Sequence, residues 1–212
     1  MVNGFNRFGW IVLLVPLWMM GCTSTSMVHS DTTRYFLLSA NVPPPLALVE
    51  KRAYVQVDPL DIPEYLNRPE IVIRAGAQEM VLSDFNHWGE DLSANLTRVL
   101  EENLANLLPD ISIDTISESL PLKQRGYRLS VKIIQFELAS EEKVVLRLLW
   151  RLYSVDERRL LAIERWRGQS ERLENRDYPL MVASMNRLLE EVSRKLALVI
   201  TEIDHHAAPI DR

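Results

Sequence analysis

Few residues of this sequence have the type and spacing that catalysis or ligand binding requires. The chain of 212 residues contains one cysteine, Cys22, so an internal disulfide is impossible and a folded domain beyond it has no thiol for Cys–His catalysis. His205 and His206 are adjacent but lack the spaced cysteine or carboxylate ligands of a metal site. The sequence also has no Gly-rich phosphate loop, G-x-S-x-G elbow or H-E-x-x-H motif. We therefore predict no catalytic residue, no metal site, no cofactor and no enzymatic activity.

Cys22 is placed for modification, because it follows an apolar leader. Residues 1–21 begin with a polar stretch that carries Arg7, continue with the apolar run Trp10–Met20 and end in Gly21. The run has the length of a signal-peptide core and is short for a transmembrane helix. Gly21-Cys22 resembles a bacterial lipobox, in which the thiol receives a diacylglycerol and the leader is cut before the cysteine, although methionines fill the two preceding positions. We predict a lipoprotein signal peptide over residues 1–21. A signal peptide cut elsewhere, or an uncleaved N-terminal helix, is the alternative.

Lipid chains on Cys22 would hold the protein on a membrane without a transmembrane helix. Each buried acyl CH₂ contributes about 0.8 kcal/mol, and about two chains or more give stable anchoring. Thr23, and not an aspartate, follows the cysteine; by analogy with the sorting of such lipoproteins, this favours the outer membrane. Residues 22–33 are polar and rich in serine and threonine, which predicts a flexible tether. We expect a lipid-anchored protein on the periplasmic face of the outer membrane.

The rest of the chain has the composition of a folded domain. Hydrophobic residues make up 47% of the sequence, which is enough for a core. The formal net charge of −5 and the absence of a basic run argue against a nucleic-acid partner. We predict one domain over residues 34–204 and a tail over residues 205–212.

Alternation of apolar and polar residues predicts the strands of this domain. The predicted strands are Ala53–Asp58, Ile71–Ile73, Ile111–Ile116, Tyr127–Leu138, Val144–Tyr153 and Leu160–Gly168. Residues 75–83 could extend the second of them into a hairpin, and Arg34–Leu38 is an edge strand or a docked arm. At Ile133-Ile134 the parity of the apolar residues changes, which predicts a β-bulge that keeps one face buried.

Two amphipathic helices complete the predicted domain. Apolar residues recur at spacings of three and four over about Trp88–Leu108, with Asp84 or Asn86 as the candidate N-cap. A second apolar stripe occupies Met181–Ile203, and Asp177 can cap that helix. The order of elements predicts an α+β fold: a mostly antiparallel sheet with the two helices packed on one face.

Arginines alternate with apolar residues on two neighbouring predicted strands. Arg147, Arg151, Arg165 and Arg167 take the outward-facing positions. The simpler interpretation is a solvated sheet face whose arginines pair with nearby carboxylates. The alternative is a polar surface for a neighbouring subunit, with Arg147 and Arg151 as contact candidates.

The turn before the second predicted strand carries the most specific pattern in the chain. The motifs are Val55-x-Val57-x-Pro59, Ile62-Pro63-x-Tyr65-Leu66-x-Arg68-Pro69-x-Ile71-Val72-x-Arg74, Trp88-x-Glu90-x-Leu92, Arg98-Val99-Leu100-x-x-Asn103-Leu104 and Leu107-Leu108-Pro109. In combination they resemble the signature of the ABC-type transport auxiliary lipoproteins, among them the PqiC-like intermembrane transport lipoproteins. The resemblance extends from Cys22 to about Pro109. Asn67 and Gly89 depart from the acid and the alanine that the pattern leads us to expect.

The resemblance implies a function and partners. Such lipoproteins sit at the outer membrane and cap or guide a tunnel made by a partner with MCE domains, which is anchored in the inner membrane and moves lipids between the membranes. They are non-catalytic and are expected to assemble as a homo-oligomeric ring around the C-terminal helical region of that partner. On this model Tyr65, Leu66 and Arg68 face another subunit or the partner. The alternative for these three residues is a structural turn.

Two other classes of function stay open at this point. One is a monomeric cell-envelope scaffold lipoprotein that is not involved in lipid transport. The other is a hydrolase whose carboxylates converge only in the folded chain, which would require a pocket with perturbed pKa values.

Overall fold

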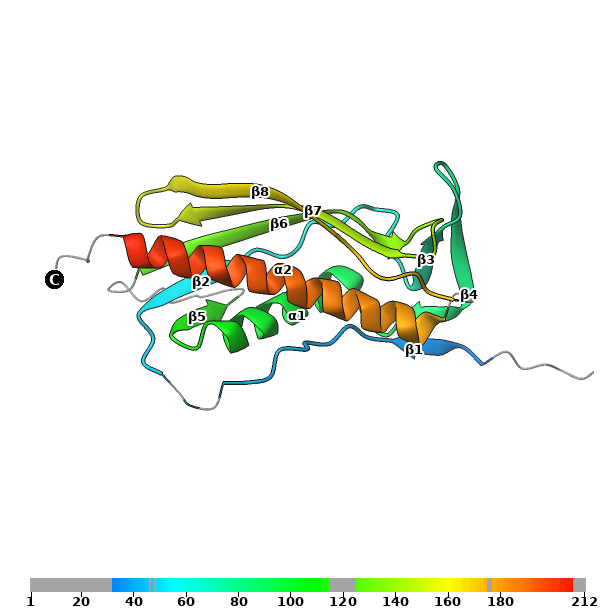
Figure 1. Cartoon of the computed structure of the whole chain (residues 1–212), viewed down its shortest axis with the longest axis horizontal. Helices are drawn as coiled ribbons and strands as arrows, with labels where there is room; N and C mark the ends of the chain where they lie inside the picture. Colours follow the sequence, from blue (N-terminus) through cyan, green and yellow to red (C-terminus); the bar gives the residue numbers. More distant parts are fainter. Residues whose placement is uncertain (1–31, 46, 48, 115–124, 175–176, 208–212) are drawn as a thin grey trace, which may run out of the picture. The chain divides into compact units, whose positions relative to one another are not determined.

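The computed structural model describes residues 32–45, 47, 49–114, 125–174 and 177–207. The predicted signal peptide, Cys22 and nearly all of the predicted tether lie outside these residues. The strands are β1 (Arg34–Phe36), β2 (Ala53–Val57), β3 (Glu70–Arg74), β4 (Met80–Trp88), β5 (Ile111–Asp114), β6 (Arg125–Leu138), β7 (Val144–Ser154) and β8 (Arg159–Gln169). The helices are α1 (Leu92–Leu107) and α2 (Tyr178–His206), so α2 continues two residues past the predicted end of the domain (Figure 1).

The strands of the described residues form one mixed sheet. Its order is β1-β4-β3-β6-β2-β5, and β7 and β8 extend from the opposite edge of β6. The pairings β1–β4, β2–β5, β2–β6 and β3–β6 are parallel, whereas β3–β4, β6–β7 and β7–β8 are antiparallel. The prediction of a mostly antiparallel sheet is therefore wrong: the sheet is largely parallel in its strand pairings. Alternation shows which side chains of a strand are buried, but it is the same for both directions of a neighbouring strand.

The predicted β-bulge in β6 is confirmed. The register between β6 and β7 shifts between Ile133 and Gln135. Ile134 is left 39% exposed, whereas Ile133 before it and Phe136 after it are buried. The extra residue thus restores one apolar face after the change of parity.

The first helix begins later than the sequence predicts. Asp84 and Asn86, the candidate caps, lie in β4, and α1 begins after its N-cap Asp91. The sheet holds the residues before this point, because the N–H of Trp88 donates to the carbonyl of Pro69 at 2.7 Å. Trp88 fits the helical spacing of the apolar residues, but in the structure it is the last residue of β4.

The two helices lie on the same side of the sheet and pack against one another (Figure 1). The α1 stripe is buried as predicted and consists of Leu92, Leu96, Val99, Leu100 and Leu104. Asp177 caps α2, and its side chain accepts a hydrogen bond from the N–H of Leu180 at 3.1 Å. The α+β class with two amphipathic helices is confirmed. No helix of the described residues combines the length and apolarity needed to cross a membrane.

Residues 34–42 form first an edge strand and then a docked arm, the two states that the sequence left open. β1 pairs in parallel with the end of β4. Beyond β1, the N–H of Leu38 donates to Asn95 Oδ1 at 2.8 Å, and Asn95 Nδ2 donates to the carbonyl of Leu38 at 3.0 Å. Further amide side chains of α1 and α2 hold the arm at Ser39 and Val42. The arm through which the domain joins its N-terminal segment is thus fixed to both helices.

Candidate functional site

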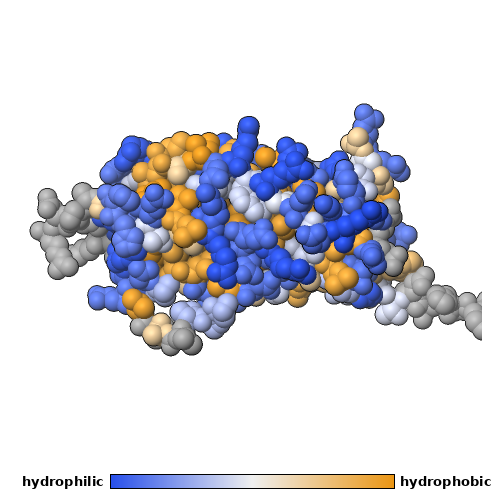
Figure 2. Space-filling view, in the orientation of Figure 1, coloured by the Kyte–Doolittle hydropathy of each residue, from blue (hydrophilic) through white to orange (hydrophobic). Residues whose placement is uncertain are grey.

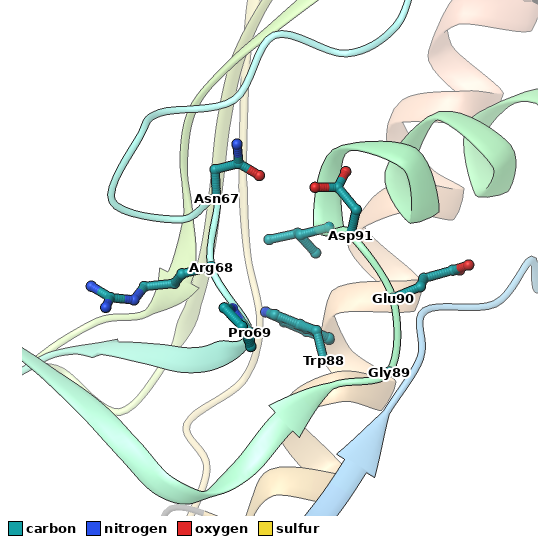
Figure 3. A pocket seen from close by; sticks show the side chains of 8 residues that line it. Asn67, Arg68, Pro69, Trp88, Gly89, Glu90 and Asp91 are labelled. Atoms are coloured by element: carbon teal, nitrogen blue, oxygen red, sulfur yellow. The ribbon is translucent and has the colours of Figure 1, made fainter.

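The two most specific stretches of the sequence meet in the fold. Residues 62–74 contain a turn and β3, while residues 88–92 join β4 to α1. The hydrogen bond from Trp88 to Pro69 connects them directly. Between them lies a pocket of about 420 Å³ (Figure 3). Its lining consists of Asn67, Arg68, Pro69, Trp88, Gly89, Glu90, Asp91 and Leu92.

Local backbone geometry builds the first wall of this pocket. The carbonyl of Pro63, whose ring fixes φ, accepts a hydrogen bond from the N–H of Leu66 at 2.9 Å. The next bond of the same turn joins the N–H of Asn67 to the carbonyl of Glu64 at 3.1 Å. This turn reverses the chain and brings Asn67 to the pocket. The turn that the motif predicts is therefore present.

The charged groups at the pocket already have partners within the chain. Arg68 Nε lies 3.0 Å from the carboxylate of Glu70 and, through this hydrogen bond, lowers the pKa of that carboxyl. Glu90 lies 2.6 Å from Arg98. Asp91 accepts the capping hydrogen bond of α1. These pairs leave none of the three lining charges unpartnered.

Apart from the amide of Asn67, the remaining lining is apolar. Trp88, Pro69 and Leu92 contribute this surface, and Figure 3 shows the side chains of Arg68 and Glu90 directed away from the Trp88 ring. The lining contains no cysteine, serine, histidine or lysine, and its two carboxylates are engaged, Glu90 with Arg98 and Asp91 with the N-terminus of α1. The pocket thus combines apolar surface with charged groups that are already paired within the chain.

The structure gives Tyr65 and Leu66 positions inside the chain. Leu66 is buried, so the contact expected of it has no exposed side chain to make it. The hydroxyl of Tyr65 donates to Glu137 Oε2 at 3.0 Å, and Arg74 Nε donates to Glu137 Oε1 at 2.7 Å. Burial, reinforced by the charge of Glu137, raises the pKa of Tyr65 to about 12. Of the three contact candidates in the turn, Arg68 is the one whose side chain is substantially exposed.

Arg147 and Arg151 lie on the face of the sheet opposite the helices, as predicted. Arg147 stands between Gln135 of β6 and Arg167 of β8 in the strand register. Arg151 stands beside Ile163. In the part of the chain that the structure describes, neither arginine forms a salt bridge with a carboxylate. The carboxylate partners of a simply solvated face are therefore not found there.

The sequence patterns did not predict two buried carboxylates. Glu137 of β6 gathers the donors of the turn, and Asp204 near the end of α2 accepts from Tyr127 at 2.8 Å and from Arg125 at 2.9 Å. Arg52 also pairs with Asp204. Glu137 stands between the apolar residues Phe136 and Leu138 near the end of a predicted strand, and an acid so enclosed is the signal that could have found the first. Among the described residues, no group of three or more histidines, cysteines and acids is arranged to hold a metal.

Comparison with known proteins identifies the family. The family model of the ABC-type transport auxiliary lipoprotein component matches residues 36–197. The chain belongs to this family. The match runs from the last residue of β1 through most of α2, and so it includes both stretches that form the pocket. The sequence has no match among proteins of curated function.

Two solved structures share the fold of this auxiliary lipoprotein. A Xanthomonas campestris protein of the family DUF330 is 14% identical, with a TM-score of 0.64 over 82% of this chain and 100% of that one. A second structure, of an uncharacterized protein, is 20% identical, with a TM-score of 0.63 over 80% of this chain and 99% of that one. A PelC dodecamer from Paraburkholderia phytofirmans is 13% identical, with a TM-score of 0.39 over 72% and 92% of the two chains.

Proposed function

We propose that this protein is an outer-membrane-anchored, periplasmic, non-catalytic accessory subunit of an MCE-type intermembrane lipid transport system. The observation that carries the proposal is the family match over residues 36–197, which makes the chain an auxiliary transport lipoprotein. Lipid on Cys22 holds the domain at the membrane, and the domain binds the MCE-domain partner as a homo-oligomeric ring. The lining of the pocket, whose charged groups are all paired within the chain, supports binding rather than catalysis.

The pocket beside Arg68 supplies the partner contact in this proposal. Arg68 is exposed at the rim, where its guanidinium can exchange Glu70 for a carboxylate of the partner. Trp88 is 6% exposed and belongs to the core, so only a small part of it reaches the pocket beside Arg68. Arginine is among the residues that dominate binding energy at protein interfaces.

The test is co-purification from detergent-solubilised membranes with the full chain as bait. We expect the MCE-domain protein of the same cell to co-purify and the bait to run as a multiple of the protomer mass. Arg68→Glu should reduce the capture of the MCE protein several-fold. Arg172→Glu is the matched control, because Arg172 is also exposed and paired with a glutamate, and it should leave capture unchanged.

A monomeric bait that captures no MCE protein would overturn the proposal. Capture of peptidoglycan or outer-membrane assembly proteins in its place would favour the envelope scaffold.

A further inference from the structure

The β3–β4 connection and the first part of β4 carry exposed apolar side chains next to acids. Val81, Leu82 and Phe85 are 40%, 38% and 44% exposed. Glu79 and Asp84 are exposed beside them. We call residues 75–85, the connection together with the first residues of β4, the hairpin tip. Figure 1 shows it projecting from the sheet, and Figure 2 shows the same projection in a space-filling view. A projecting surface that is both apolar and acidic is suited to contact with another surface.

The backbone of the hairpin tip is also open on one side. β4 pairs with β3 through residues 80–82 and with β1 through residues 86–88. Among the described residues, no strand pairs with the outer edge of β4 between residues 80 and 85. Exposed strand edges of this kind are sites at which another chain can dock.

The open face of β7 and β8 has the complementary character. Arg147, Arg151, Arg165 and Arg167 lie on it, and Ile163 among them is 52% exposed. No salt bridge within the described residues involves these four arginines. The face therefore combines uncompensated positive charge with apolar surface.

The neighbouring strand shows that this charge is a local property of β7 and β8. The two cations on the same face of β6, Arg128 and Lys132, each pair with an aspartate, Asp58 at 2.8 Å and Asp61 at 2.5 Å. The chain thus neutralises the sheet face where β6 runs and leaves it positive where β7 and β8 run.

We propose that the hairpin tip of one copy docks on the open face of β7 and β8 in a second copy of this chain. Acids and apolar groups of the tip would then meet arginines and apolar groups of the face. The inference rests on the homo-oligomeric assembly proposed above and assigns its interface.

The topology favours a contact between copies. β4 and β8 lie on opposite sides of β6 in the sheet order, so the tip and the face belong to opposite edges of the sheet. A contact between two different surfaces is heterologous, and repetition of such a contact closes into a ring when the rotation allows it. This contact therefore accounts for a ring in which the copies follow one another head to tail.

Charge reversal on the full-length, detergent-solubilised protein tests the contact, with native mass spectrometry or light scattering as the readout. The variant Glu79→Arg/Asp84→Arg should lose the oligomer, and so should Arg165→Glu/Arg167→Glu, because each places like charges opposite one another. A mixture of the two variants should regain the oligomer. Where the two variants alternate in an assembly, each reversed tip meets the two new glutamates of a reversed face, and each native tip meets the four arginines of a native face.

Two controls keep the outcome informative. Arg187→Glu reverses an exposed charge of α2 away from both surfaces and should leave the oligomer intact. The chain with all four reversals should reassemble on its own, which a misfolded chain would not do. Oligomers that survive both double reversals, or variants that do not complement one another on mixing, would overturn the interface.

The capture experiment separates this inference from the proposed function. Double-reversal variants that stay oligomeric but lose the MCE protein would assign these surfaces to the partner and overturn contact between copies. A wild-type chain that is monomeric yet captures the MCE protein would overturn the interface and the ring while leaving the transport role standing.

Discussion

The hydroxyl of Tyr65 donates a hydrogen bond to Glu137 across 72 positions of sequence, at 3.0 Å. This contact fastens the turn of residues 63–67 to β6 in the middle of the sheet. Glu137 also accepts a hydrogen bond from Arg74 of β3. The residues of the motif Tyr-Leu-x-Arg-Pro thus have different roles. Tyr65 and Leu66 hold the turn in place, and Arg68 remains at the surface.

Tyr65→Phe should destabilise the domain by about 1–3 kcal/mol, because a buried carboxylate loses one of its donors. The measurement is the free energy of unfolding in denaturant. Tyr35→Phe is the control, since Tyr35 is 68% exposed and should change stability little. Equal stability of the wild type and Tyr65→Phe would show that the hydroxyl contributes nothing to the fold.

The same pair predicts a pH dependence. The pKa of Tyr65 is raised to about 12 in the folded chain, above its ordinary value of about 10. The unfolded chain therefore releases this proton first, so the stability from Tyr65 is complete below about pH 10 and is lost as the pH rises to about 12. The unfolding free energy of Tyr65→Phe should fall less steeply over that window. Parallel pH profiles for the two proteins would contradict the expectation.

Asn95→Ala should release the N-terminal arm from α1. The substitution leaves the N–H and carbonyl of buried Leu38 without their partner and should cost about 1–3 kcal/mol. Amide hydrogen exchange would report the change as faster exchange at Leu38, ahead of global unfolding. Asn67→Ala, at an exposed position, is the control. Unchanged exchange at Leu38 would mean that the arm is held by other contacts.

Gly168→Ala should destabilise the packing between β8 and α2. A Cβ at this position would collide with the ring of Trp166 and lie 3.0 Å from Leu188 Cδ2. Overpacking of this kind costs about 1–3 kcal/mol, which a lower Tm would show. Gly76→Ala is a matched control, because its nearest neighbour would be Glu79 Cβ at 3.9 Å. A Tm equal to that of the control would indicate that Trp166 moves aside freely.

Cys22→Ser should release the protein from the membrane fraction, because it removes the thiol that receives the lipid. Thr23→Asp should keep the lipid but shift the protein from the outer to the inner membrane on a density gradient. Retention of Cys22→Ser on membranes would refute the lipobox and indicate an uncleaved N-terminal helix.

The sequence predicted the elements that local patterns define. The apolar stripes of α1 and α2 were evident from periodicity, and the cap Asp177 from its position just before Pro179 at the start of α2. The short connections between β6, β7 and β8 indicated an antiparallel run. The bulge at Ile134 was also evident from the sequence. Where the alternation of apolar residues changes parity, one extra residue in the strand keeps the same face buried.

Contacts between distant parts of the chain were decided by the tertiary structure. The position of β2 between β5 and β6, the extension of β4 to Trp88 and the gathering of donors at Glu137 have no local signature. The spacing of apolar residues indicates which side chains are buried, because the hydrophobic effect favours the burial of each apolar side chain individually. The pattern does not indicate which elements the buried side chains contact. The choice and direction of a neighbouring strand depend on how the backbone N–H and C=O groups of the whole chain find hydrogen-bond partners.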